Sequence, residues 1–259
     1  MPVLLVDTHA HLNHEDFTAD LPDTIERARS AGVTRMVVPG YDLPSSERAV
    51  QLAAQYDGVY AAVGVHPHDA KTFDGAALAQ IRQLAAAPKV VAIGEVGLDF
   101  HYNFSPPEKQ MEAFDAQVLL ALDLDLPLIV HTREASSEVL DILTRRRSPR
   151  MTGVMHHFSG DASYAQASIG LGFMLGIAGP VTYKKNEEMR EVVRGVGLPH
   201  LVVETDSPYA SPQPVRGKRN EPASVVYVAE KLAELLDLSM EQIAAQTTEA
   251  AVELFRIGK

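Results

Sequence analysis

The chain has 259 residues, of which 46% are hydrophobic and 22% are charged, a composition typical of a globular protein and not of a disordered one. It contains no cysteine, which excludes a disulfide scaffold, an iron–sulfur site and a thiol nucleophile. Its formal net charge of -11 argues against a protein that coats nucleic acid through bulk electrostatics, although a local cationic patch stays open.

Short apolar runs rich in β-branched residues alternate with amphipathic stretches along the chain. The runs are continuous, which is typical of parallel strands that helices cover on both faces. Predicted strands span residues 4–6, 33–40, 58–65, 89–97, 126–132, 152–158, 172–178 and 200–206. Predicted helices span residues 19–31, 44–56, 75–86, 106–124, 134–146, 161–169, 186–194 and 222–236, with a further helix at 239–256.

Eight strand–helix units in a chain of this length predict an α/β fold, a single-domain (β/α)8 or TIM barrel over residues 1–259. A doubly wound sheet of eight strands is the structural alternative, but no glycine-rich phosphate loop follows any strand. Gly32, Gly58 and Gly197 fall between a helix and the next strand, where a residue that tolerates positive φ is favoured.

The N-terminal apolar run, Val3 to Val6, is too short for a signal peptide. No run approaches the length that a membrane-spanning helix needs. We therefore expect a cytoplasmic protein that has no membrane partner, and we expect it to be a monomer.

Ionisable residues gather where the predicted strands end. They are Asp7, His9 and His11 after the first strand, His66 and His68 after the third, Glu95 and Asp99 on the fourth, His131 on the fifth, His156 and His157 on the sixth, and Glu204 and Asp206 on the eighth. The carboxyl ends of barrel strands share one rim, and barrel active sites are built there. The sequence therefore predicts one active site at this rim.

Several of these residues have the types and the spacing of metal ligands. His9 and His11 are two residues apart, so on a strand both imidazoles can reach one ion, although two structural histidines would give the same pattern. Asp7 could orient one of these histidines. Glu95 follows an apolar run between two glycines, where a carboxylate is either a ligand or a costly burial. Glu204 and Asp206 would share a strand face and repel each other without a cation.

Together the predicted ligands number six and are enough for two divalent ions if one carboxylate bridges them. They are His9, His11, Glu95, His131, His156 and Asp206, with Glu95 as the natural bridge. The mixture of nitrogen and oxygen donors suits Zn²⁺, Mn²⁺ or similar ions better than an all-oxygen Mg²⁺ site, and the identity of the ion stays open among these three.

A loop after the eighth predicted strand is basic although the chain as a whole is acidic. It contains Arg216, Lys218 and Arg219, and Arg133 lies two residues after His131. These cations could hold phosphate groups beside the metal ions, or they could be ordinary surface residues.

Eight motifs that span residues 7 to 222 resemble those of a known family. In order they are DTHAHLN, GVHPHDA, GEVGLDF, PLIVHTREA, HHFSG, GPVTYKK, VVETDSPY and RGKRNEP. The set is similar to the TatD family of metal-dependent deoxyribonucleases, within the amidohydrolase-like barrel superfamily. The resemblance covers essentially the whole chain and implies a barrel with a two-metal site that hydrolyses phosphodiester bonds in DNA.

The resemblance also implies roles for single residues. His9, His11, Glu95 and Asp206 would hold one ion, and Glu95, His131 and His156 would hold the other. His66, His101 and Arg133 match positions near the substrate phosphate, and the loop Arg216–Pro222 is intact. One departure is His157, which stands where the family usually has cysteine and could compete with His156 as a ligand.

We therefore expect a metal-dependent DNase, a 3′→5′ exonuclease that acts on the ends of single-stranded DNA. Glu95 and Asp206 would be the catalytic residues, with Asp206 accepting a proton from the water that two metals activate. The alternative enzyme is a small-molecule amidohydrolase that cleaves a cyclic amide, lactone or ester, and it would have an apolar or carboxylate-binding rim in place of the basic loop. A binding protein on an inactive barrel would lack a metal ligand, and none is missing from the sequence.

Overall fold

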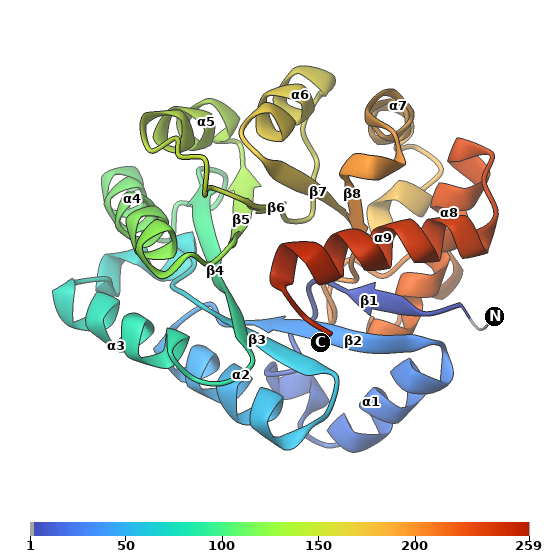
Figure 1. Cartoon of the computed structure of the whole chain (residues 1–259), viewed down its shortest axis with the longest axis horizontal. Helices are drawn as coiled ribbons and strands as arrows, with labels where there is room; N and C mark the ends of the chain where they lie inside the picture. The colour runs from blue at the N-terminus through green and yellow to red at the C-terminus, as the bar shows by residue number, and fades with distance from the viewer. Residues whose placement is uncertain (1–2, 259) are drawn as a thin grey trace. The chain divides into compact units, whose positions relative to one another are not determined.

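A computed structural model describes residues 3–258 of the protein (Figure 1). Residues 1–2 and 259, the ends of the predicted single domain, lie outside the described residues. The eight strands form one sheet in which spatial order follows chain order. They are β1 (Leu5–Asp7), β2 (Val33–Pro39), β3 (Val59–Val63), β4 (Val90–Asp99), β5 (Leu128–Arg133), β6 (Gly153–Met155), β7 (Phe173–Ile177) and β8 (Leu201–Val203).

A helix follows each strand, and a ninth helix ends the described chain (Figure 1). The helices are α1 (Leu21–Ser30), α2 (Leu43–Gln55), α3 (Gly75–Ala85), α4 (Pro107–Leu124), α5 (Ser136–Arg145), α6 (Ala162–Gly170), α7 (Glu187–Val196), α8 (Val225–Leu236) and α9 (Met240–Phe255). The strand pairs β1–β2, β3–β4, β4–β5, β5–β6 and β7–β8 are parallel. This order and alternation confirm the predicted (β/α)8 barrel fold.

The described residues fall into two compact units. Among the described residues, the first unit consists of 3–38, 157–166 and 174–258, and the second consists of Pro39–His156 and Ala167–Phe173. In the first unit α9 packs against β1 and β8 (Figure 1). In the second unit α4 packs against β4, and the core contains Ile93, Phe114 and Ile129. That the whole chain acts as one domain stays a prediction.

Strand ends differ from their predicted positions at three places that matter for the site. β6 ends at Met155 and β8 ends at Val203, so His156 and Asp206 lie in the loops that follow. β4 continues to Asp99, two residues beyond the predicted end, which places Asp99 on the same strand as Glu95. The backbone of Asp206 has a φ of 55°, so strand alternation does not extend to it, and the prediction that Glu204 and Asp206 share a strand face is wrong.

Three glycines take the backbone conformation that the sequence predicts. Gly32, Gly58 and Gly197 have φ values of 89°, 75° and 71°, and each lies between a helix and the next strand. Only glycine adopts this region without a steric penalty from Cβ. No helix among residues 3–258 is long and apolar enough to cross a membrane.

Gly97 lies where β4 passes close to β5. It pairs with His131 in the parallel ladder, its φ is 140°, and a Cβ at this position would collide with the carbonyl oxygen of His131. We expect Gly97→Ala to lower the free energy of unfolding by about 1–3 kcal/mol, because the strand must shift or the backbone must strain.

Denaturant unfolding measures this difference, and Gly75→Ala is the matched control. Gly75 begins α3 and has open space where its Cβ would stand, so its substitution is expected to preserve or raise stability. If the two variants had equal free energies of unfolding, the close approach of β5 at Gly97 would not be what limits the side chain there.

Candidate metal-binding active site

The first unit brings His9, His11 and Asp206 together. The Nε2 atoms of the two histidines are 3.1 Å apart. Asp206 Oδ1 is 3.5 Å from Nε2 of His11 and 3.9 Å from Nε2 of His9. Both imidazoles are buried, whereas the Asp206 side chain is 14% exposed. Three ligand atoms therefore converge at a point that solvent reaches from the Asp206 side.

Main-chain hydrogen bonds fix this first cluster. Ala10 forms a parallel bridge with Ser207, the amide of His11 donates to the Ser207 carbonyl at 2.8 Å, and the amide of Asp206 donates to the His9 carbonyl at 2.9 Å. This bridge joins the segment that follows β1 to the segment that follows β8, beyond the last residues of both strands. It explains why His9 and His11 point the same way although β1 already ends at Asp7.

Asp7 anchors the backbone beside this cluster. Its carboxylate accepts hydrogen bonds from the Thr205 amide at 2.9 Å, the Thr205 hydroxyl at 2.6 Å and the His9 amide at 3.2 Å. Burial raises the pKa of Asp7 to about 8, although the hydrogen bonds from Thr205 and His9 oppose that rise. The prediction that Asp7 orients a histidine is corrected in one respect, since Asp7 holds the main chain of His9 and not its imidazole.

The second unit gathers three imidazoles around the buried carboxylate of Glu95. Glu95 Oε1 is 3.0 Å from His131 Nδ1, 3.4 Å from His66 Nε2 and 3.8 Å from His156 Nε2. Sequence reasoning predicted His131 and His156 here but gave His66 a role at the substrate. Burial lowers the pKa of His66 to about 4, which keeps this imidazole neutral and able to ligate a metal.

A break in strand register aims Glu95 into the second cluster. The pairing of β4 with β5 shifts between Ile93 and Val96, and the Glu95 amide donates to the Gly40 carbonyl at 2.7 Å. A bulge of this kind re-aims a side chain and is common next to active sites. The glycines that flank Glu95 in the sequence leave room for this approach, because a Cβ on Gly94 would stand 2.5 Å from Cβ of Ile129.

Asp99 is a further part of the second cluster, and it was predicted to lie at the rim but not to be a ligand or a substrate contact. Its Oδ2 lies 2.9 Å from His68 Nε2 and 3.2 Å from His131 Nε2. Burial alone would raise the pKa of Asp99, but hydrogen bonds from His131, from the Tyr102 amide and from His68 hold it below its ordinary value. The available signal was spacing, since residues 95 and 99 of a strand lie on the same face.

The donor sets of both clusters fit a divalent cation. In each, the three donor atoms lie within 4.8 Å of one another, and each set combines imidazole nitrogen with carboxylate oxygen. The sets are His9, His11 and Asp206 in the first unit, and His66, Glu95 and His131 in the second. Mixed nitrogen and oxygen donors suit Zn²⁺ or Mn²⁺.

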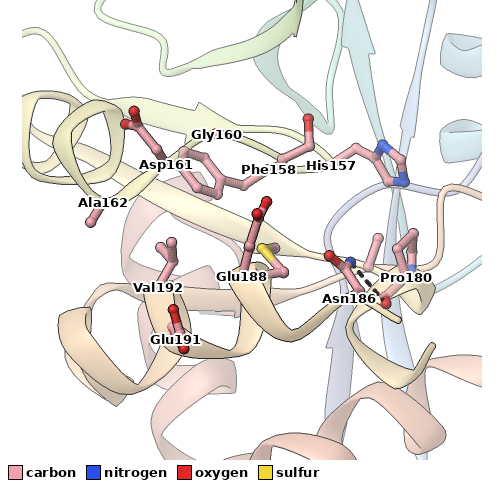
Figure 2. Close-up of a pocket in the computed structure, with 13 residues that line it drawn as sticks. His157, Phe158, Gly160, Asp161, Ala162, Pro180, Asn186, Glu188, Glu191 and Val192 are labelled. Carbon is pink, nitrogen blue, oxygen red and sulfur yellow. Dashed lines mark hydrogen bonds between the residues drawn. The ribbon is translucent and has the colours of Figure 1, made fainter. Parts of the chain in front are cut away.

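His157 lines a cavity and belongs to neither of these donor sets. Its amide donates to Glu204 Oε1 at 2.5 Å, and its side chain lines a cavity of about 590 Å³ between the loop after β6 and α7 (Figure 2). Within residues 3–258, the groups with metal-ligand geometry do not include His157. Competition between His157 and His156 for a metal is therefore not supported by the structure of the described chain.

The cavity beside His157 is unsuited to phosphate. Figure 2 shows Asp161, Glu188 and Glu191 around it, together with apolar side chains such as Phe158 and Val192. Carboxylates would repel a nucleic-acid backbone at this place. The side chains predicted to contact phosphate lie elsewhere.

The three cations of the basic loop are not equivalent. Arg219 donates to both carboxylate oxygens of Asp20, at 2.8 and 2.7 Å, and also to the Asp16 carbonyl. Arg216 lies over the ring of Tyr183, 4.2 Å from its centroid, and Lys218 is exposed. Arg219 thus serves a structural ion pair, and Arg216 and Lys218 are the loop cations presented to solvent.

The other two predicted substrate contacts lie on the second unit next to one aromatic side chain. The guanidinium of Arg133 is 4.5 Å from the ring centroid of Tyr102. His101 Nδ1 is 2.6 Å from Glu134 Oε1, and its ring also contacts Tyr102 edge to face. Both side chains are exposed, as a contact with substrate requires.

Comparison with known proteins agrees with this geometry. The family model described as TatD related DNase matches residues 6–256. The chain is 46% identical to the uncharacterized metal-dependent hydrolase YabD of Bacillus subtilis, over 98% of this chain and 100% of that protein. It is 36% identical to the 3′-5′ ssDNA/RNA exonuclease TatD of Klebsiella pneumoniae, over 98% of both chains.

A solved structure extends the agreement to the fold. The crystal structure of YJJV, a TatD homologue from Escherichia coli, superimposes with a TM-score of 0.94 at 32% identity and covers 100% of both chains. The family model spans nearly the whole chain, and the relatives match it over nearly their full length. These two findings agree on the family of this protein. The chain belongs to the TatD-related DNase family of metal-dependent hydrolases.

Proposed function

We propose that this protein is a metal-dependent 3′→5′ exonuclease that acts on the ends of single-stranded DNA. The observation that carries the proposal is the convergence of His9, His11 and Asp206, with histidine nitrogens 3.1 Å apart beside a partly exposed carboxylate. The TatD protein of Klebsiella pneumoniae, named as a 3′-5′ ssDNA/RNA exonuclease, supports the same activity.

The proposed ligands are His9, His11 and Asp206 in the first unit and Glu95, His131 and His156 in the second, with His66 as an added candidate. The bridging role of Glu95 between two ions stays a prediction from the sequence. When bound, the ions supply Lewis-acid activation of water and of the phosphodiester. Zn²⁺ and Mn²⁺ fit the donors better than Mg²⁺ does.

Asp206 is the residue proposed to receive the proton of the attacking water. Its carboxylate is the partly exposed member of the first cluster, so water can reach it, while His9 and His11 are buried. The Asp206 amide and the anchored Thr205 hold this carboxylate in place. A positioned base with these properties contributes to hydrolysis by accepting a proton as the oxygen attacks phosphorus.

Removal of the metal ions tests the reaction class. We expect chelator treatment to abolish cleavage of single-stranded DNA and added Zn²⁺ or Mn²⁺ to restore it, because the ions would supply the activation of the attacking water and of the phosphodiester. Ion content per chain, measured by mass spectrometry before and after dialysis, must follow the activity. Full activity in protein shown to be free of metal would contradict the proposal.

The loop cations give a separate expectation for DNA binding. Changing Arg216 and Lys218 together to Gln should weaken binding and lower the salt slope of log K by about 1.4, at ~0.7 per lost contact on a single strand. Arg219→Gln should leave the slope nearly unchanged, because its guanidinium already pairs with Asp20. Titration of a labelled oligonucleotide at several salt concentrations measures all three slopes.

Unchanged affinity and slope in the Arg216 and Lys218 variant would make the loop an ordinary solvated surface. The small-molecule amidohydrolase would then gain support, and its test is hydrolysis of a panel of lactones and cyclic amides. Retained metal content in the variant is the control, since the proposed ligands lie on other segments.

A further inference from the structure

We propose that Tyr102 and Phe104 form a stacking platform for unpaired nucleobases, and that this platform gives the enzyme its preference for single strands. The proposal rests on the nuclease function proposed above and adds how that site recognises its substrate. Both residues lie in the loop between β4 and α4, in the second unit.

The two rings lie parallel to each other and are open to solvent. Their planes differ by 2° and their centroids are 5.3 Å apart. Tyr102 is 48% exposed and Phe104 is 56% exposed. Large aromatic side chains normally bury most of their surface, and an exposed apolar cluster marks a binding site more often than a single exposed ring does.

The loop that carries these rings is held in one conformation by buried polar groups. Asp99 Oδ1 accepts from the amides of His101 and Tyr102 at 3.1 and 3.0 Å. The buried Gln110 amide nitrogen donates to the carbonyls of Asp99 and Ser105, both at 2.9 Å. The rings are therefore exposed on an ordered backbone, and a preorganised surface loses little conformational entropy when a ligand binds.

A cation accompanies the platform. The Arg133 guanidinium lies 4.5 Å from the centroid of Tyr102 and is itself exposed. Single-strand binding proteins combine aromatic side chains that stack with bases and cations that follow the phosphates. Tyr102, Phe104 and Arg133 supply both components in one place, whereas the acidic cavity of Figure 2 supplies neither cation nor exposed ring.

One side chain joins the platform to the second histidine–carboxylate cluster. The ring of His68 is 4.8 Å from that of Phe104 and 5.7 Å from that of Tyr102. Its Nε2 lies 2.9 Å from Asp99 Oδ2, the same oxygen that is 3.2 Å from His131 Nε2. A base stacked on the platform would thus lie one residue from the proposed metal ligands, which suits a nucleotide close to the bond that is cut.

Stacking explains a substrate preference that charge alone cannot. Every base has a π-face, so the platform would accept any sequence, but bases inside a duplex already stack on their neighbours. RNA and DNA bases would be accepted alike. We therefore expect discrimination between single-stranded and duplex substrates to depend on Tyr102 and Phe104.

The test compares the full-length, metal-loaded double variant Tyr102→Ala/Phe104→Ala with wild type. Fluorescence anisotropy is measured with an ordinary single-stranded oligonucleotide, an abasic one of equal length and a duplex. Loss of stacking should weaken binding of the ordinary strand by about 5- to 150-fold. This range corresponds to the stacking energy of ~1–3 kcal/mol that one base loses when the aromatic side chain is replaced by alanine. Binding of the abasic strand and of the duplex should stay within about twofold of wild type.

Two further variants separate stacking from other effects. Phe104→Leu keeps an apolar side chain without a flat face and should also weaken binding of the ordinary strand. Leu119→Ala removes an exposed apolar side chain on α4, away from the platform, and should bind like wild type. The salt slope of log K should stay at the wild-type value in both ring variants, because no phosphate contact is lost.

The outcomes distinguish this inference from the proposed function. If the double variant bound and cut the ordinary strand as wild type does, the platform would be overturned while the nuclease function stood. Equal weakening for ordinary and abasic strands, with a lowered salt slope, would assign the effect to phosphate contacts and also overturn it. If wild-type protein bound neither strand and cut neither, both proposals would fail together.

Discussion

Asp206→Asn is expected to reduce turnover on single-stranded DNA by more than ~10²–10⁴-fold, the usual cost of losing a general base, because a metal ligand is weakened as well. The side chain keeps its size, and the main-chain bond from residue 206 to His9 remains, so the fold should persist. Steady-state rates at saturating substrate, with circular dichroism as the check on folding, measure the effect.

An exposed aspartate on another element provides the control for this variant. Asp141 lies on α5 at the surface, and Asp141→Asn should cut DNA at the wild-type rate. If Asp206→Asn stayed within tenfold of wild type, the base would have to be another carboxylate. Glu204 is poorly placed for that role, since it is fully buried and its carboxylate accepts from the His157 amide.

Glu95→Gln is expected to remove more metal than His131→Ala. His66, His131 and His156 all approach Glu95 Oε1, at 3.4, 3.0 and 3.8 Å. A neutral amide keeps the volume of the side chain but loses the negative charge that offsets the cation. Metal content per chain after purification measures the difference, and turnover should fall with it.

The surface residue Glu108 gives the matched control for this substitution. Glu108→Gln changes an exposed side chain in the first turn of α4 and should leave both metal content and turnover unchanged. Two tightly held ions per chain in the Glu95→Gln variant would contradict the bridging role that the sequence predicts for this residue.

The fold was predictable because its signal is repeated along the chain. Continuous apolar runs such as 126–132 recur eight times with helical stretches between them, and only a few topologies accommodate that pattern. The ligand candidates were predictable for a related reason, since polar residues at the ends of buried strands have few structural explanations. The positions of strand ends were harder to predict, because β6 and β8 have only three residues each.

Contacts between distant segments could not be predicted from the sequence. Arg219 pairs with Asp20, 199 positions away, and nothing local distinguishes it from the exposed Lys218. His66 approaches Glu95 because of a register break that depends on the neighbouring strands. The parallel rings of Tyr102 and Phe104 depend on Asp99 and Gln110, whose buried hydrogen bonds fix the loop.

The most direct test of the account is the cleavage pattern of end-labelled single-stranded DNA. Metal-loaded protein is incubated with oligonucleotides that carry a label at the 5′ or at the 3′ end, and products are separated over time. The account predicts that the 5′-labelled strand shortens stepwise, that the 3′-labelled strand releases its label as a mononucleotide at the earliest times, and that chelated protein does neither. Internal cuts at the first time points, or shortening from the 5′ end, would contradict it.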